Sequence, residues 1–402
     1  MVAKDLRVQA MENPEGERPK SPRSKLPRTV VLEGSSSRMG LTHGLLLGDE
    51  IHFLARQLDR RVFQRVDPIR RPGLRIAART LAFILGHHIP ESLKEELRGI
   101  SVGSDIPYAD LLLMNTLDDV LNILRRLAPS MPSTACSSFV IFGDRTWNGE
   151  LLHGRNLDYH FHDTPLDDNG EVARLLLQNA TLFAYHPTDR ASFISVAWPG
   201  IVGVTTAMNE AGICLGNLTS YLRGTTPNGV PTAILYRTIA EHASRLRDVG
   251  QLLRAARRTV GNNLLVSSGS ENRAGLFEIT MDSVTEVPPK DGVLIATNHF
   301  VSPVLARRQR PYVDADSVRK WERLHALSVH GRFGPDRALA ILADTHEGNG
   351  NRPLARIANE GTAVSVLFHP AAGEMWLGTN SHPPASGGEF RRLGTSKLLN
   401  AA

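Results

Sequence analysis

Three residues of this chain combine a thiol, a guanidinium and a carboxylate within one short stretch: Cys136, Arg155 and Asp158. The sequence alternates like a half-buried strand after Cys136, and the segment that leads to Asp158 is predicted to be a returning strand. Asn148-Gly149 between the two segments is a favoured two-residue hairpin turn, so we expect the strands to pair. The hairpin would bring the thiol to the strand that carries the two charges. That grouping suits an activated nucleophile, because a nearby cation favours the thiolate.

The alternative for Cys136 is a buried structural cysteine, which is the usual state of an isolated thiol. The chain has only two cysteines, so the comparison with Cys214 is informative. Cys214 lies in Gly212-Ile213-Cys214-Leu215-Gly216, with no polar neighbour, and is interpreted as a core residue. The charged residues Arg155 and Asp158 downstream of Cys136 favour the interpretation of Cys136 as a nucleophile.

The block from Cys136 through Gly154-Arg155-Asn156-Leu157-Asp158 resembles the cysteine N-terminal nucleophile (Ntn) hydrolases. The closest branch is the isopenicillin N acyltransferase-like (acyl-CoA:6-aminopenicillanic acid acyltransferase) family. Acid ceramidase, N-acylethanolamine amidase and the bile-salt and penicillin V acylases are more distant relatives. The resemblance implies a four-layer αββα sandwich. It also implies cleavage between Ala135 and Cys136, which makes Cys136 a chain terminus.

Acid–base chemistry explains why such a cysteine should be terminal. A thiol has a pKa of about 8.5 and an α-amine one of about 8, so a terminal cysteine carries a matched base in the same residue. Before cleavage that nitrogen belongs to an amide and cannot accept a proton. Cleavage therefore creates the base and exposes the nucleophile in one event.

The resemblance also assigns roles to residues around Cys136. Arg155 would hold the thiolate and the substrate, and Asp158 would orient the α-amine and stabilise its charged form. Asn298, in Ala296-Thr297-Asn298-His299-Phe300, matches the Asn whose amide donates to the oxyanion; the alternative is an Asn that caps a strand or turn. Asn217 interrupts a strand pattern, where Asn is disfavoured, and either lines the pocket or is structural.

A late basic residue near the pocket is a further feature of the family. The segment Ser317-Val318-Arg319-Lys320-Trp321 resembles that region, and the register leaves Arg319 and Lys320 as alternatives. Ser317 to Lys320 also fits the Ser-x-x-Lys signature of acylating serines. Such a short match is near chance, and its companion Lys-Thr-Gly is absent.

Composition narrows the class of protein. Of the 402 residues 41% are hydrophobic and 22% charged, which is ordinary for a globular protein. Two cysteines exclude a disulfide framework and indicate a reducing compartment, so we expect a cytoplasmic protein. The first residues lack an apolar signal segment, and no apolar run is long enough to span a bilayer. The net charge of +5 comes from scattered arginines without interleaved aromatics, which argues against nucleic-acid binding.

The chain divides into three parts. Residues 1–28 are polar and basic and are predicted to be a disordered leader. Residues 29–135 are predicted to be a mostly helical precursor segment, with a short strand at 29–33 and a loop at 34–40. Residues 136–402 form the catalytic segment of the same domain. Strands grouped in hairpins and helices grouped in pairs predict an α+β fold.

The expected protein is an autoproteolytically activated amidohydrolase or acyltransferase. It would form an S-acyl intermediate on Cys136 and pass the acyl group to water or an amine. Its substrate would be an acyl amide or an acyl thioester, with an amine as a possible acceptor. The two cleaved chains would stay associated with each other. No metal or organic cofactor is implied. Two alternatives stay open: a non-cleaving binding or regulatory protein of the same fold, and an unrelated serine hydrolase.

Overall fold

The computed structural model describes residues 27–63, 68–125, 133–134, 136–160, 170–309, 312–346 and 356–400. The predicted leader therefore lies outside the described residues, apart from its last two positions. Ala135 and the proline-rich approach at 126–132 also lie outside them. The first described strand begins at Arg28, one residue before the predicted start.

The described residues form the following elements. The helices are α1 (Ser36–Leu58), α2 (Arg71–Gly86), α3 (Glu91–Ser104), α4 (Tyr108–Leu124), α5 (Glu171–Asn179), α6 (Thr232–His242), α7 (Leu246–Ala255), α8 (Pro303–Gln309), α9 (Ala315–Ser328), α10 (Pro335–Leu342) and α11 (Ser396–Leu399). The strands are β1 (Arg28–Gly34), β2 (Ser133–Thr134), β3 (Ser137–Gly143), β4 (Gly149–His160), β5 (Thr181–Pro187), β6 (Phe193–Ala197), β7 (Thr206–Asn209), β8 (Ile213–Thr219), β9 (Asn262–Ser268), β10 (Arg273–Ile279), β11 (Val284–Val287), β12 (Val293–Ala296), β13 (Thr362–His369), β14 (Glu374–Gly378) and β15 (Phe390–Gly394).

The strands build two sheets, which confirms the α+β class. One sheet has eight strands in the order β1-β5-β6-β7-β8-β9-β10-β11, and the other has seven, in the order β12-β3-β4-β13-β14-β15 with β2 beside β4. Among the described strands, β1 and β5 make the one parallel pair, and the other pairs are antiparallel. Neighbouring strands are therefore mostly joined as hairpins.

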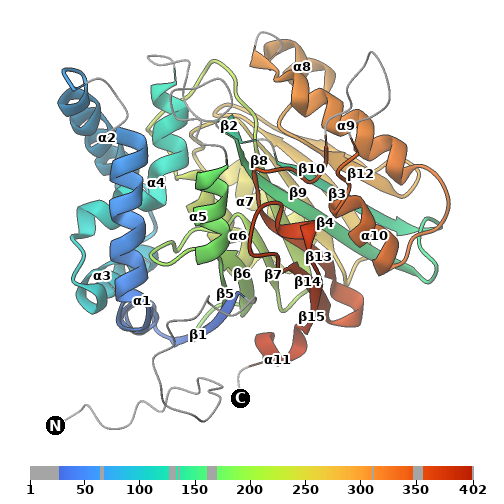
Figure 1. Cartoon of the computed structure of the whole chain (residues 1–402), viewed down its shortest axis with the longest axis horizontal. Helices are drawn as coiled ribbons and strands as arrows, with labels where there is room; N and C mark the ends of the chain where they lie inside the picture. The colour runs from blue at the N-terminus through green and yellow to red at the C-terminus, as the bar shows by residue number, and fades with distance from the viewer. Residues whose placement is uncertain are drawn as a thin grey trace.

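Helices cover the outer faces of the two sheets. Helices α9 and α10 pack on β3, β4, β12 and β13, while α6 and α7 pack on β7 to β11. The sheets contact each other through β3, β9, β10 and β12. Helices α1 to α4 gather on one side of the molecule, and α8 to α10 lie on the other (Figure 1). Among the described residues, no helix is both long and apolar enough to cross a membrane.

Residues 34–40 do not form the predicted loop, because α1 already begins at Ser36. Ser35 caps the helix by accepting a hydrogen bond from the Arg38 amide at 3.3 Å. The glycines that suggested a loop instead allow two helix backbones to approach closely. A Cβ atom at Gly40 or Gly44 would collide with the α3 backbone at Glu96 or Ile100. Glycine is thus required by packing rather than by a turn.

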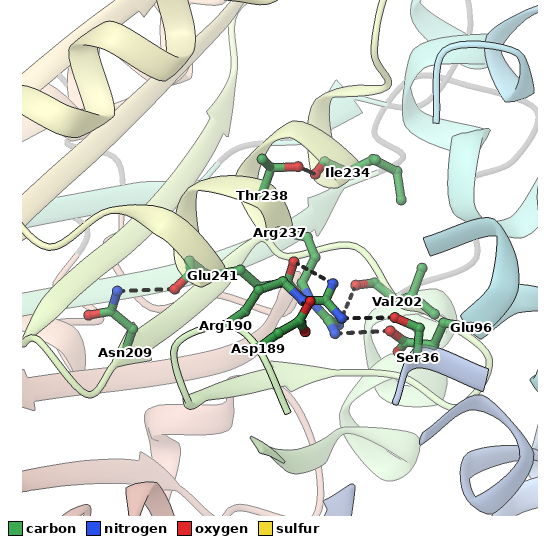
Figure 2. Close-up of polar contacts among 11 residues, drawn as sticks. Ser36, Glu96, Asp189, Arg190, Val202, Asn209, Ile234, Arg237, Thr238 and Glu241 are labelled. Atoms are coloured by element: carbon green, nitrogen blue, oxygen red, sulfur yellow. Dashed lines mark hydrogen bonds and ion pairs between the residues drawn. The ribbon is translucent and has the colours of Figure 1, made fainter. Parts of the chain in front are cut away.

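A buried ionic network joins helices α1 and α3 to α6 and to Arg190, which follows β5 (Figure 2). Arg237 of α6 donates to Glu96 of α3 at 3.0 Å and to Glu241 at 2.8 Å. Arg190 donates to Glu241 at 3.1 Å and to Ser36 of α1 at 2.9 Å. The side chains of Arg237 and Glu96 are fully buried. Each cation therefore bridges residues from both sides of the Ala135–Cys136 bond.

Candidate active site

The predicted hairpin is confirmed by the pairing of β3 with β4, but the predicted turn at Asn148-Gly149 is wrong: Gly149 already pairs with Gly143, and residues 144–148 connect the two strands. Its register sets Ser137 opposite Asn156 and Ser138 opposite Arg155. Cys136 comes directly before β3, so it lies beside the end of β4. The Cys136 thiol contacts the Asp158 carbonyl oxygen at 3.9 Å, and Cys136 is only 3% exposed. The local sequence therefore places the thiol next to the Arg155–Asp158 block, as expected.

Arg155 points between the two sheets, where it lies close to the thiol. One guanidinium nitrogen, Nη2, is 4.0 Å from the Cys136 sulfur. The other, Nη1, donates to the Asn217 carbonyl oxygen on β8 of the opposite sheet. Arg155 is buried, so this bond holds a desolvated cation at a defined position.

Burial and the Arg155 charge act in opposite directions on the pKa of the Cys136 thiol. Burial raises the pKa of Cys136 above its ordinary value, and the Arg155 charge partly opposes that rise. The Asp158 carboxylate raises the pKa of the thiol further. In the uncut chain the thiol therefore stays protonated at neutral pH. Burial also lowers the pKa of Arg155.

Asp158 points away from the opposite sheet, toward α9. Its Oδ2 forms a buried ion pair with the Lys320 ammonium and accepts a hydrogen bond from the Asn359 amide at 3.3 Å. Lys320 is therefore the member of the Arg319/Lys320 pair that joins the cluster. Arg319 is partly exposed and pairs with Asp316, one turn away on α9.

Asn359 is a member of the cluster that the sequence did not indicate. Its backbone amide donates to Thr362 Oγ1 at 3.1 Å, and its Oδ1 accepts from the Gly361 amide at 2.8 Å. These bonds fix the turn before β13 and aim the side-chain amide at Asp158. In sequence the segment reads as an ordinary polar turn, which carries no signal of a site.

The two predicted asparagines meet at β8. Asn217 lies within β8 and its carbonyl oxygen accepts the Arg155 bond described above. Asn298 follows β12, and its Nδ2 donates to the Thr219 carbonyl oxygen at 2.8 Å, two residues along β8 from Asn217. Both residues are buried. Asn298 thus reaches the cluster through β8, and the structure records no direct bond between Asn298 and Cys136 within the described residues.

Several buried polar atoms around Cys136 have no hydrogen-bond partner among the described residues: Ser137 Oγ, Arg155 Nε, Asp158 Oδ1 and Asn217 Oδ1. Buried polar atoms are normally paired, because an unmade bond costs about 1–3 kcal/mol. A concentration of unpaired atoms beside a thiol marks a place where another group is expected to bind. Cys214 differs, since it lies fully buried in β8 and matches the predicted core position.

The sequence matches the model of the acyl-coenzyme A:6-aminopenicillanic acid acyl-transferase family over residues 147–382. The match covers more than half of the chain, so the chain belongs to this family. The family assignment made from the sequence is therefore confirmed. Arg155, Asp158, Asn298, Lys320 and Asn359 fall within the matched residues, and Cys136 precedes them.

Curated relatives cover most of this chain. An uncharacterized protein of Archaeoglobus fulgidus is 27% identical over 394 residues, which span 86% of this chain and 62% of the relative. Protein dcd1B of Dictyostelium discoideum is 26% identical over 63% of this chain and 50% of its own length. Protein dcd1A of the same organism is 24% identical over 65% of this chain and 60% of its own length. The chain spans less than two thirds of these relatives.

Two solved structures are also similar. A Caenorhabditis elegans ortholog of N-acylethanolamine-hydrolyzing acid amidase has a TM-score of 0.43 and 14% identity, covering 59% of this chain and 93% of that one. A conjugated bile acid hydrolase from Clostridium perfringens has a TM-score of 0.42 and 10% identity, covering 66% of this chain and 95% of that one.

Proposed function

We propose that Cys136 is the nucleophile of an autoproteolytically activated amidohydrolase or acyltransferase, within a four-layer αββα sandwich of the Ntn hydrolase type. The observation that carries this proposal is the position of the thiol. The Cys136 thiol lies 4.0 Å from a buried guanidinium and close to Asp158, whose Oδ1 has no hydrogen-bond partner among the described residues. The order of helix, sheet, sheet and helix described above supports the proposed architecture.

The first reaction would be cleavage of the chain. The Cys136 sulfur attacks the Ala135 carbonyl carbon, a C–S bond forms, the C–N bond breaks, and the thiol proton passes to the departing nitrogen. Water then hydrolyses the Ala135 thioester, leaving a carboxylate on Ala135 and a free thiol on Cys136. The new α-amine would bind Asp158 Oδ1, which Lys320 and Asn359 hold in place through Oδ2.

Turnover would repeat the same chemistry on an external substrate. The α-amine accepts the thiol proton as the sulfur attacks the acyl carbon, and it returns this proton to the leaving amine when the C–N bond breaks. Water or an amine then attacks the S-acyl intermediate, and its proton passes through the α-amine to the sulfur. Asn298 Nδ2, oriented by the Thr219 carbonyl, and Asn217 are the proposed donors to the oxyanion.

The mass of the purified protein tests the proposal directly. We expect two associated chains, residues 1–135 and 136–402, and iodoacetamide labelling at Cys136. A full-length chain without labelling at Cys136 would instead favour a binding or regulatory protein. Labelling by a serine-directed fluorophosphonate, together with hydrolysis that survives Cys136→Ala, would favour a serine hydrolase.

A further inference from the structure

A cavity of about 220 Å³, here called the inner cavity, is lined in part by residues that adjoin the Cys136 cluster. These residues are Tyr159, Thr205 and Thr219. Tyr159 directly follows Asp158, the Thr205 carbonyl accepts from the Asn217 amide at 3.0 Å, and the Thr219 carbonyl accepts from Asn298. This inner cavity therefore shares its wall with the residues that hold the site.

The walls of the inner cavity are mainly apolar and come from both sides of the proposed cleavage point. Helix α1 contributes Leu54 and Leu58, and α4 contributes Leu117 and Leu121. Leu176 of α5 and Trp198 also line it. A cavity of this kind fits an apolar acyl chain, since its burial would stabilise the complex by about 0.8 kcal/mol per methylene.

A second, outer cavity of about 710 Å³ adjoins the first. Gln57, Leu58 and Met114 line both. Helix α4 runs past the two cavities in turn, with Asp110 and Leu113 in the outer cavity and Leu117 to Arg125 in the inner one. At about 1.5 Å per residue, positions 110 and 118 are about 12 Å apart, so the two cavities follow one another along α4.

The outer cavity has a surplus of positive charge. Four arginines line it, and two of them are paired, Arg75 with Asp59 at 2.6 Å and Arg79 with Asp110 at 2.5 Å. The other two, Arg56 and Arg60, lie on the surface and have no acidic partner among the residues that the structure describes. Guanidinium groups bind planar carboxylates through two parallel hydrogen bonds.

The inner cavity has no such surplus. Asp118 and Asp119 line it together with Arg61 and Arg125, so charges of both signs balance there. Arg61 pairs with Glu171 at 3.4 Å, and Arg125 stacks on the Tyr221 ring at 3.7 Å. An anionic group is therefore attracted to the outer cavity more strongly than to the inner one.

We propose that the acyl group of the substrate is an apolar chain that ends in a carboxylate. The chain lies in the inner cavity with its reacting carbonyl at Cys136, and the terminal carboxylate lies in the outer cavity beside Arg56 and Arg60. This inference rests on the proposed function of Cys136. It adds a substrate class that the nucleophile alone does not specify.

Protection of the thiol tests the proposal without requiring a known substrate. In cleaved protein, the rate at which iodoacetamide alkylates Cys136 is measured at increasing concentrations of sebacic acid monoamide or of its methyl ester. The two probes have the same chain, and only the acid carries the charge. We expect the acid to give half-maximal protection at a concentration about tenfold lower than the ester, equivalent to about 1.4 kcal/mol.

Matched variants test whether the difference in protection between the acid and the ester depends on Arg56 and Arg60. In the double variant Arg56→Gln/Arg60→Gln, the ester-to-acid ratio of the half-maximal concentrations should fall from about ten to about one, and protection by the ester should be unchanged. Arg254→Gln removes an exposed arginine from α7 and should keep the full ratio. Leu117→Trp should fill the inner cavity and weaken protection by both probes, with circular dichroism to confirm that the variant is folded.

The outcomes separate this inference from the proposed function. Equal protection by acid and ester in the wild-type protein would overturn the inference, as would a ratio that persists in the double variant. Failure of both probes to protect a reactive thiol would also overturn it. A cleaved protein whose Cys136 does not react with iodoacetamide would count against the proposed nucleophile itself.

Discussion

Arg237 and Glu96 form a fully buried ion pair, with 3.0 Å between Nη2 and Oε2, although 141 residues separate them in sequence. Glu96 belongs to the proposed precursor segment and Arg237 to the proposed catalytic segment. The pair therefore joins the two parts of the chain independently of the peptide bond before Cys136. It is the best candidate for a contact that would hold the two chains together after the proposed cleavage.

Loss of this pair should weaken the association of the cleaved chains. Arg237→Met leaves a buried carboxylate at Glu96 without its cation, and removing one partner of such a pair costs about 3–5 kcal/mol. We expect a clearly lower Tm and separation of the chains at a lower urea concentration. Arg98→Gln is the control, because Arg98 pairs with Glu91 on the surface of the same helix. Equal effects of the two substitutions would contradict the proposed role of Arg237.

Substitution of the two cysteines should have opposite results. Cys136→Ala should abolish both cleavage and turnover, because no other group can form the thioester. Cys136→Ser should cleave slowly at most, since a hydroxyl performs the same acyl shift less readily. Cys214→Ala should leave both reactions largely intact and cost only packing energy, since Cys214 is buried in β8. Intact mass and peptide mapping after iodoacetamide treatment measure each result, and labelling mainly at Cys214 would refute the assignment.

Arg155 should control the pH dependence of thiol alkylation. Its charge lowers the pKa of the Cys136 thiol and so opposes the effect of burial. Arg155→Ala removes that cation, so the pKa should rise and the alkylation profile should move to higher pH. The rate at neutral pH should fall because less thiolate is present. An unchanged profile would remove Arg155 from the site.

The late cation can be identified by two substitutions on one helix. Lys320→Met leaves the buried Asp158 carboxylate without its ion pair, so cleavage and turnover should both fall by about a hundredfold, the scale of an electrostatic contact in a buried site. Arg319→Met changes a partly exposed neighbour and should leave both rates nearly unchanged. Asp158→Asn should reduce both rates at least as much as Lys320→Met. Equal losses in the two α9 variants would indicate a general effect on the helix.

Asn298 distinguishes an oxyanion donor from a structural cap. If Nδ2 donates to the oxyanion, Asn298→Ala should lower kcat by about a hundredfold or more with a smaller change in KM, because the bond is strongest in the transition state. If the bond to the Thr219 carbonyl is its main contribution, the Tm should fall instead and kcat per folded molecule should persist. Both quantities are measured on the same variant, and a destabilised but fully active enzyme would exclude the donor role.

Local sequence patterns were sufficient to predict the part of the site that runs from Cys136 to Asp158. The hairpin from Cys136 to Asp158 follows from the strand patterns on either side of a short polar connection, and these patterns act over a few residues. The turn itself differs from the prediction, because residues 144–148 join the strands and Gly149 already pairs with Gly143. The family of the chain could also be recognised from this block. The loop predicted at 34–40 was wrong because Gly40 allows α1 to approach the backbone of α3, about 60 residues away in sequence, and does not form a turn.

The sequence by itself determined which chemical groups are available and which of them neighbours in a hairpin must bring together. Only the tertiary structure selected Lys320 over Arg319, added Asn359 to Asp158, and set Arg237 against Glu96. The physical reason is that periodicity shows which residues share a helix face but not what that face packs against. That choice depends on the burial of surfaces distant in sequence, and the free energy of burial has no local signature.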